Sequence, residues 1–159
     1  MTKIDANPPF DIHEPRLRSL YGYWQAKKHG DDLPARADID PLEMKEWLGN
    51  LMLIEFHGDV SDYQIRLDGT NLEHYYGAPR TGGGVETLTS MEERKLLLTQ
   101  YKTVLDEKCP AYYEAEFTNS DGVFSRQAKL ILPLSADKQR VDMVLVGIYF
   151  RAMDQPDSF

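Results

Sequence analysis

Four histidines are the first candidates for catalysis or metal binding: His13, His29, His57 and His74. None of them stands at a recognised metal-ligand spacing from another histidine, a cysteine or a carboxylate. No serine–histidine–aspartate or cysteine–histidine set can be assembled from the sequence either. The pattern therefore predicts neither a metal site nor a catalytic constellation.

Two polar residues fall inside segments that have the pattern of strands. Arg66 could bind a carboxylate or phosphate through its planar guanidinium. It could instead be a solvated strand residue paired with Glu114 or Glu116, which we expect to face solvent. We favour this second interpretation because most charges on sheets are solvated. Gln127 is in phase with the apolar side of its strand, where a polar side chain needs a partner or a ligand.

Two further features invite a chemical interpretation. Gly82, Gly83 and Gly84 could cradle phosphate, but no Lys-Ser or Lys-Thr pair follows them as in a phosphate loop. We therefore predict a flexible loop. Cys109 precedes Pro110 at the end of a predicted helix, which indicates a structural cysteine. As the single cysteine it excludes an intrachain disulfide and fits a reducing compartment.

The bulk composition limits the classes of protein. The 159 residues are 42% hydrophobic and 28% charged, which predicts one globular domain. A net charge of −8 repels phosphate backbones and anionic lipids, so we expect no nucleic-acid or membrane partner. No signal peptide is apparent, and no apolar run approaches the ~18 residues of a spanning helix. We expect a cytoplasmic protein.

The first third of the chain is predicted to be mainly helical. An arm over about residues 1–12 precedes a helix that stops near Gly30, and its apolar stripe is Leu17, Leu20, Tyr21 and Trp24. A second helix should begin at Pro41, with Asp40 as its cap and Glu43 reaching back to that cap. Its inner face is Met44, Trp47, Leu48 and Leu51. A strand over residues 51–56 follows directly.

The rest of the chain alternates between helix and strand signals. We expect a strand over residues 63–67, a helix over 70–77 opened by a capping box at Thr70, and a helix over 90–108 opened by another at Ser90. Three strands should follow, over 112–117, 123–132 and 140–150, with a tight turn at 119–122 and Pro133 closing the second. The first two strands of the chain should pair antiparallel and the last three should form a meander. The helices between them should cross one face, leaving the first helix for the other face or an edge.

This order resembles the PAS fold, and the leading segment resembles the PAS_5 family of bacterial PAS-like proteins. The resemblance rests on residues 17–24, 33–43, 63–70 and 130–134, with a helix ending at Tyr76 and Gly77, and covers about residues 14–150. It implies an α+β domain with a five-stranded antiparallel sheet, helices over one face and N-terminal helices, with residues 151–159 as a tail. It also implies a regulatory sensor module, commonly a homodimer, without naming a ligand.

The resemblance also implies where a ligand cavity would lie. The cavity candidates are Arg66, His74, Tyr76, Tyr101, Tyr113, Gln127 and Met143. The tyrosines could line a pocket for a small, partly aromatic or carboxylated ligand, but aromatic residues at core spacing usually only pack. Haem sensors of this fold use a histidine on the longer helix, which has none here, and flavin photosensors use an Asn-Cys-Arg motif, which Cys109 lacks. We expect neither haem nor flavin.

Two functions of different classes remain open. The first is a stand-alone sensor or adaptor that binds a small ligand, a protein partner or both, contacts its partner through the first helix and the outer sheet face, and carries no output domain. The second is a small isomerase or dehydratase with a cone-shaped cavity, for which His74 and Asp68 would be the candidate bases beside a tyrosine donor. The order of strands and helices favours the sensor. A domain that only contacts proteins cannot be separated from it by sequence.

Overall fold

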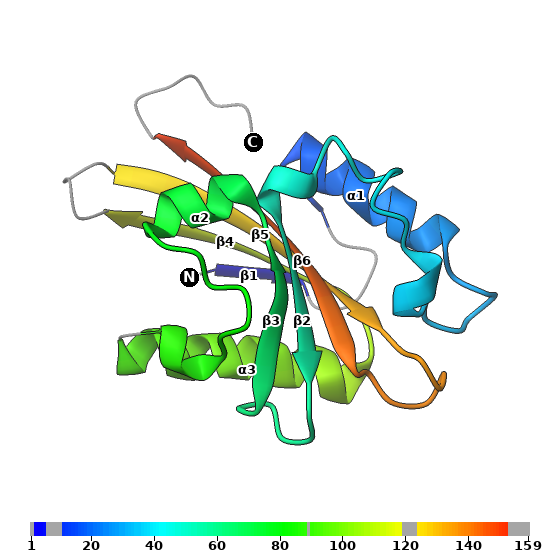
Figure 1. Cartoon of the computed structure of the whole chain (residues 1–159). Helices are drawn as coiled ribbons and strands as arrows, with labels where there is room; N and C mark the ends of the chain where they lie inside the picture. The colour runs from blue at the N-terminus through cyan, green and yellow to red at the C-terminus, as the bar shows by residue number, and fades with distance from the viewer. Residues whose placement is uncertain (1, 6–10, 89, 119–123, 153–159) are drawn as a thin grey trace.

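The computed structural model describes residues 2–5, 11–88, 90–118 and 124–152 (Figure 1). The strands are β1 (Thr2–Asp5), β2 (Leu51–Phe56), β3 (Tyr63–Asp68), β4 (Ala111–Thr118), β5 (Phe124–Leu134) and β6 (Met143–Ala152). The α-helices are α1 (Pro15–Ala26), α2 (Thr70–Tyr76) and α3 (Met91–Glu107), and the short 3-10 turns are η1 (Arg36–Asp38), η2 (Leu48–Asn50) and η3 (Val85–Thr87). The predicted turn at 119–122 and the tail after residue 152 lie outside the described residues.

The strands form one antiparallel sheet in the order β1-β4-β5-β6-β2-β3. The predicted hairpin of β2 and β3 and the predicted meander of β4, β5 and β6 are both present, and these five strands make the expected PAS-like sheet of an α+β fold. β1 adds a sixth strand beside β4. The prediction of a loose arm over residues 1–12 was therefore wrong for residues 2–5.

The two faces of the sheet pack against different helices. Leu17, Leu20 and Trp24 of α1 join one apolar cluster with Leu130 and Leu145 of the sheet. The second cluster includes Leu72 of α2, Tyr101 and Val104 of α3, and Tyr113, Ile131, Val146 and Ile148 of the sheet. We call the face under α1 the outer face and the face under α2 and α3 the inner face. Figure 1 shows α1 and α3 lying apart, with strands between them.

Close packing of α1 depends on a strand residue without a side chain. A Cβ atom on Gly147 of β6 would lie 2.7 Å from Leu17 Cδ2 and 2.8 Å from Leu20 Cδ2. Real Cβ atoms do not approach so closely, so glycine lets α1 sit directly on the outer face. The first helix was expected on this face or at an edge, and it covers the face. The prediction that the outer sheet face is a free contact surface was therefore wrong where α1 lies.

The second predicted helix is not an α-helix. Residues 41–47 form successive turns that lead into η2, with hydrogen bonds from Met44 N to Pro41 O (3.2 Å) and from Trp47 N to Met44 O (2.9 Å). The apolar spacing was nevertheless informative, because Met44 and Trp47 are both buried. Glu43 does not reach back to its cap, since its carboxylate instead pairs at 2.9 Å with Lys27, the C-cap residue of α1.

The ends of α2 and α3 match the prediction except at the start of α2. Ser90 caps α3 as predicted and accepts a hydrogen bond from Glu93 N at 3.3 Å. α2 closes as predicted at Gly77 with φ +84°, but its N-cap is Gly69 rather than Thr70. A Cβ atom on Gly69 would lie 2.4 Å from the carbonyl oxygen of Gly49, so the start of α2 packs directly on the backbone of η2.

The strand ends also differ from the prediction. β5 continues through Pro133 to Leu134, although Pro133 lacks the N–H that a central strand position would need. The pairing of β5 with β4 stops at Ile131, opposite Ala111, so Pro133 pairs with β6 alone. β6 begins at Met143, three residues later than predicted.

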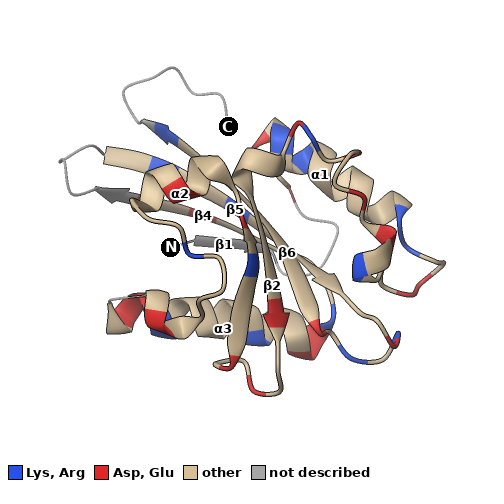
Figure 2. Cartoon of the chain, in the orientation of Figure 1, with Lys and Arg blue, Asp and Glu red and all other residues tan. Residues whose placement is uncertain are grey.

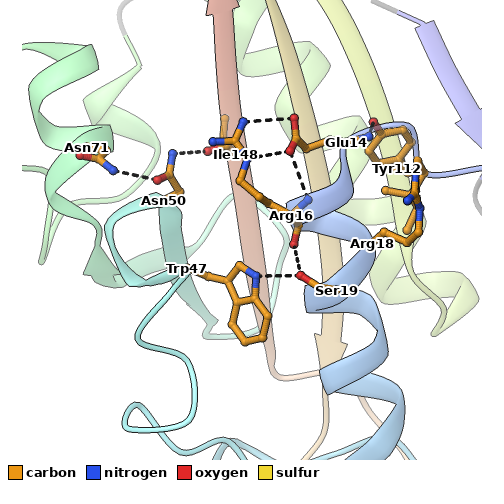
Figure 3. Close-up of polar contacts among 10 residues, drawn as sticks. Glu14, Arg16, Arg18, Ser19, Trp47, Asn50, Asn71, Tyr112 and Ile148 are labelled. Carbon is orange, nitrogen blue, oxygen red and sulfur yellow. Dashed lines mark hydrogen bonds and ion pairs between the residues drawn. The ribbon is translucent and has the colours of Figure 1, made fainter. Parts of the chain in front are cut away.

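Polar contacts link α1 and α2 to η2 and the residue before it, and η2 to the sheet (Figure 3). Trp47 Nε1 donates to Ser19 Oγ of α1 at 3.2 Å. Asn71 of α2 donates to Asn50 Oδ1 at 2.8 Å, and Asn50 Nδ2 in turn donates to the carbonyl oxygen of Ile148 in β6 at 2.8 Å. η2 therefore lies between the two helices and holds both of them.

The start of α1 has its own polar cluster. Glu14 is buried, and Arg16 binds its carboxylate with Nε–Oε1 2.7 Å. Glu114 of β4 accepts from the Tyr112 hydroxyl and lies against His13 Nδ1, each at 2.8 Å. The prediction that Glu114 faces solvent was wrong, because the segment leading into α1 covers it.

Candidate functional site

A row of polar side chains lies on the inner face of β5. Ala128 and Leu130 belong to the outer-face cluster and Ile131 to the inner-face cluster. Because side chains alternate along a strand, Gln127 and Lys129 point to the inner face, and so does Ser125. This polar row lies on β5 between β4 and β6, and Figure 2 shows charged residues on several strands of the sheet.

Lys129 is the most unusual member of the row. Lys129 is only 6% exposed, and its neighbours on the adjacent strands are Tyr113 and Ile148. Across the described residues, no hydrogen bond or ion pair reaches its side chain. Burial lowers the pKa of Lys129 from 10.5 to about 8. A buried cation without a counter-charge is costly, and such groups are commonly paired.

A buried tyrosine hydroxyl from α3 faces the same side of the sheet. Tyr101 is fully buried, and its ring makes edge contacts with Phe56 and Tyr63 at centroid distances of 5.6 and 5.7 Å. Its hydroxyl finds no hydrogen-bond partner in the described part of the chain. Burial raises the pKa of Tyr101 well above 10, so the hydroxyl stays protonated and able to donate. A buried polar group left unsatisfied costs about 1–3 kcal/mol.

A buried ion pair stands at the C-terminal end of α2. Arg80 binds Asp68 with two hydrogen bonds of 3.0 Å, and the Asp68 side chain is fully buried. The Arg80 guanidinium also lies 3.9 Å from the centroid of the Tyr76 ring. This pairing neutralises both charges and positions the Tyr76 ring.

The aromatic side chains of α2 extend this cluster to β5 and β6. The Tyr76 hydroxyl lies 3.5 Å from Gln127 Nε2, and Tyr76 is 42% exposed. Tyr75 stacks on Phe150 of β6 with ring centroids 3.5 Å apart, and Phe150 is the strand neighbour of Gln127. The two tyrosine rings of α2 therefore lie beside Gln127 and its strand neighbour Phe150, and the Tyr76 hydroxyl reaches Gln127.

Four of the predicted cavity residues come together on the inner side. Tyr101 and Tyr113 belong to the inner-face cluster, Gln127 is in the polar row, and Tyr76 contacts Gln127. Ligand contact by these residues stays a prediction.

The other three predicted cavity residues lie elsewhere. Met143 belongs to the outer-face cluster. His74 is exposed on α2. Arg66 is exposed and pairs with Glu55 of β2 at 2.8 Å, not with Glu114 or Glu116. A bulge between Leu53–Leu67 and Ile54–Ile65 leaves Arg66 as the extra residue of β3.

The glycine loop lies against the free edge of β3. Gly82 N donates to Ile65 O, and Ile65 N donates to Gly83 O, both at 2.7 Å. The loop that was predicted to be flexible thus extends the β3 ladder. A Cβ atom on Gly84 would lie 2.3 Å from the carbonyl oxygen of Tyr63, which explains a glycine there.

The catalytic alternative required a free base beside a tyrosine donor. Its two candidates were Asp68 and His74. Arg80 binds both oxygens of the Asp68 carboxylate, and His74 is exposed. Neither residue is therefore a free, buried base beside a tyrosine. Among the described residues, no group of three or more His, Cys, Asp or Glu side chains could hold a metal ion.

Sequence reasoning missed Lys129, although a signal for it existed. Lys129 is two residues from Gln127 and two from Ile131, so the phase argument that placed Gln127 on a core face applies to it equally. Arg80 had no comparable signal, because it lies in a loop with no periodicity.

A comparison with protein families identifies the family of the chain. A family model described as PAS domain, PAS_5, matches residues 12–150, and the chain belongs to this family. The chain is similar to the crystal structure of a PAS domain from Colwellia psychrerythraea, with a TM-score of 0.46 and 13% identity over 72% of this chain and 98% of that one. No curated protein matches the chain. No helix in the described ranges is both long and apolar enough to cross a membrane.

Proposed function

We propose that this PAS domain is a sensor that binds a small molecule on the inner face of the sheet, beneath α2 and α3, and relays its binding to a protein partner. The chemistry is recognition and not catalysis. We expect the protein to act in the cytoplasm, as a homodimer or with a partner of another kind.

One observation carries the proposal, namely the polar groups on the inner face, of which the Tyr101 hydroxyl and the Lys129 side chain have no hydrogen-bond partner among the described residues. The polar row of Ser125, Gln127 and Lys129 lies on a face that is otherwise apolar. Buried polar groups in folded proteins are nearly always hydrogen-bonded, and the exceptions commonly mark functional sites. Aromatic rings with a few convergent polar groups are typical of small-molecule sites.

The contacts of α2 support a relay to the outer face. Asn71 at the start of α2 is bonded to Asn50 of η2, and Trp47, just before η2, is bonded to Ser19 of α1. A ligand that shifts α2 would therefore act on the segment that also holds α1. α1 presents an exposed side away from the sheet, which includes Arg18, Gly22 and Gln25, and this side is the surface we assign to the partner.

The test is native mass spectrometry of freshly purified protein, followed by denaturing mass spectrometry of the same sample. We expect a reproducible extra mass that is lost on denaturation, and the native spectrum also reports the number of chains. A Gln127→Leu variant, which removes one polar group of the row and keeps its bulk, should carry less of that mass. If neither the wild type nor the variant carries an extra mass, the result contradicts ligand binding and favours a domain that only contacts proteins.

A further inference from the structure

The charge balance of the inner face leaves one cation uncompensated. On the inner side of strands β2 to β6, the charged side chains among the described residues are Asp68 and Lys129. Arg80 from the neighbouring loop already neutralises Asp68 through two hydrogen bonds of 3.0 Å. Lys129 forms no ion pair with a carboxylate among the described residues, so no direct contact compensates its charge, although Glu93 and Glu107 of α3 act electrostatically on Tyr76 and Tyr113.

The groups around Lys129 can all donate hydrogen bonds. A lysine ammonium offers three donors and no acceptor, and a protonated tyrosine hydroxyl and a glutamine amide each offer at least one donor. Tyr113 is the neighbour of Lys129 on β4, and Gln127 lies two residues along the same strand, about 7 Å away by strand geometry. A carboxylate accepts several hydrogen bonds and donates none, so it matches this set.

The walls of the site are apolar and aromatic. Ile148 adjoins Lys129 on β6, and Phe150 adjoins Gln127 with Tyr75 stacked upon it. A dianion such as phosphate would bring more negative charge than the single free cation balances, and buried charge without a partner is costly. The surroundings therefore favour a monoanion with an apolar body.

We propose that the ligand of this site is a small monocarboxylate with an apolar or aromatic body, and that Lys129 Nζ forms its ion pair. This assignment rests on the proposed ligand-binding function and names the ligand class for the same site. The ligand's carboxylate supplies the counter-charge that the chain does not provide, and its body packs between the rings of α2 and the strands.

The test compares carboxylates with their neutral amides on protein that has been unfolded, freed of ligand and refolded. The probes are benzoate and hexanoate, against benzamide and hexanamide, read by thermal shift and by isothermal titration calorimetry at pH 7. We expect at least one carboxylate to raise the melting temperature and its amide to bind at least tenfold more weakly. Lys129→Met should weaken carboxylate binding at least tenfold, with Lys129→Gln as the second variant if the first does not fold.

A matched control is available on the exposed side of α3. Lys102 pairs with Asp106 on the surface, so Lys102→Met removes the same charge far from the site and should leave carboxylate binding unchanged. Equal binding of acids and amides overturns the assignment, and so does unchanged carboxylate binding by the Lys129 variants. Failure of both acids to bind also overturns it.

The outcomes separate this assignment from the proposed function. A neutral molecule that co-purifies with the protein overturns the carboxylate class and leaves ligand binding standing. If the purified protein carries no extra mass and also binds none of the four probes, both the carboxylate assignment and the proposed ligand binding are contradicted.

Discussion

Replacing Lys129 with methionine should stabilise the ligand-free protein. Burial lowers the pKa of Lys129 from 10.5 to about 8, a difference of about 2.5 pK units. At 1.36 kcal/mol per unit, the charged form costs the folded state about 3 kcal/mol at pH 7, as an upper bound. Methionine has nearly the same length and carries no charge, so we expect Lys129→Met to raise the free energy of unfolding by about 2–3 kcal/mol.

The assay is urea denaturation of refolded, ligand-free wild type and variant from pH 7 to pH 10.5. Because the pKa of Lys129 is lower in the folded state than in the unfolded state, the unfolded chain binds more protons between pH 8 and 10.5. The wild type should therefore gain stability relative to Lys129→Met as the pH rises through this window. The gap between the two proteins should be widest below pH 8 and should narrow towards pH 10.5.

Lys102→Met provides the control for the loss of a lysine charge. The Lys102–Asp106 pair is exposed, and we expect a change within about 1 kcal/mol and no narrowing with pH. A Lys129→Met protein that is less stable than the wild type at pH 7, or a gap that does not change with pH, would refute the reasoning. Either result would mean that Lys129 has a compensating partner in the folded chain.

Two further predictions concern the frame around the site. Asp68→Ala leaves the buried Arg80 without its carboxylate and should lower the free energy of unfolding by about 3–5 kcal/mol in urea denaturation. Glu55→Ala, at an exposed ion pair, should lower it by less than about 1 kcal/mol. Similar values for the two variants would contradict the buried pairing. Gly69→Ala drives a Cβ atom into the Gly49 backbone and should lower the melting temperature, while an alanine at Gly22 in α1, with open space around it, should raise it slightly; the reverse order in thermal scans would be inconsistent with the close approach of α2 and η2.

Elements with one dominant local signal could be predicted from the sequence. The stripe of Leu17, Leu20 and Trp24 gave α1, and the capping box at Ser90 gave the start of α3. The strand over residues 51–56 has the bounds that the sequence predicted. In these elements local propensity and the final packing favour the same conformation, so the pattern is sufficient.

The second predicted helix shows where local signals are insufficient. The spacing of Met44 and Trp47 fits an α-helix and a run of i→i+3 turns equally well. Tertiary contacts decided between them, because Glu43 pairs with Lys27 at the end of α1 and the backbone of Gly49 lies against Gly69. Partners far apart in the sequence leave no periodic trace.

The candidate site could be predicted only where a residue followed the local alternation of its strand. Alternation placed Gln127 on the inner face, and it would have placed Lys129 there too. Alternation failed for Arg66, because a bulge in the β2–β3 pairing shifts the register of that strand by one residue. The ion pair of Asp68 with Arg80 depends on the path of a loop that carries no regular pattern.

The most direct test of the central claim, that a small molecule occupies the inner face beneath α2 and α3, is a high-resolution crystal structure of the freshly purified protein. We predict electron density for a small molecule within hydrogen-bonding distance of Lys129 Nζ and of the Tyr101 or Gln127 side chain. An inner face filled entirely by the chain's own side chains, with Lys129 paired to one of its own carboxylates, would contradict it.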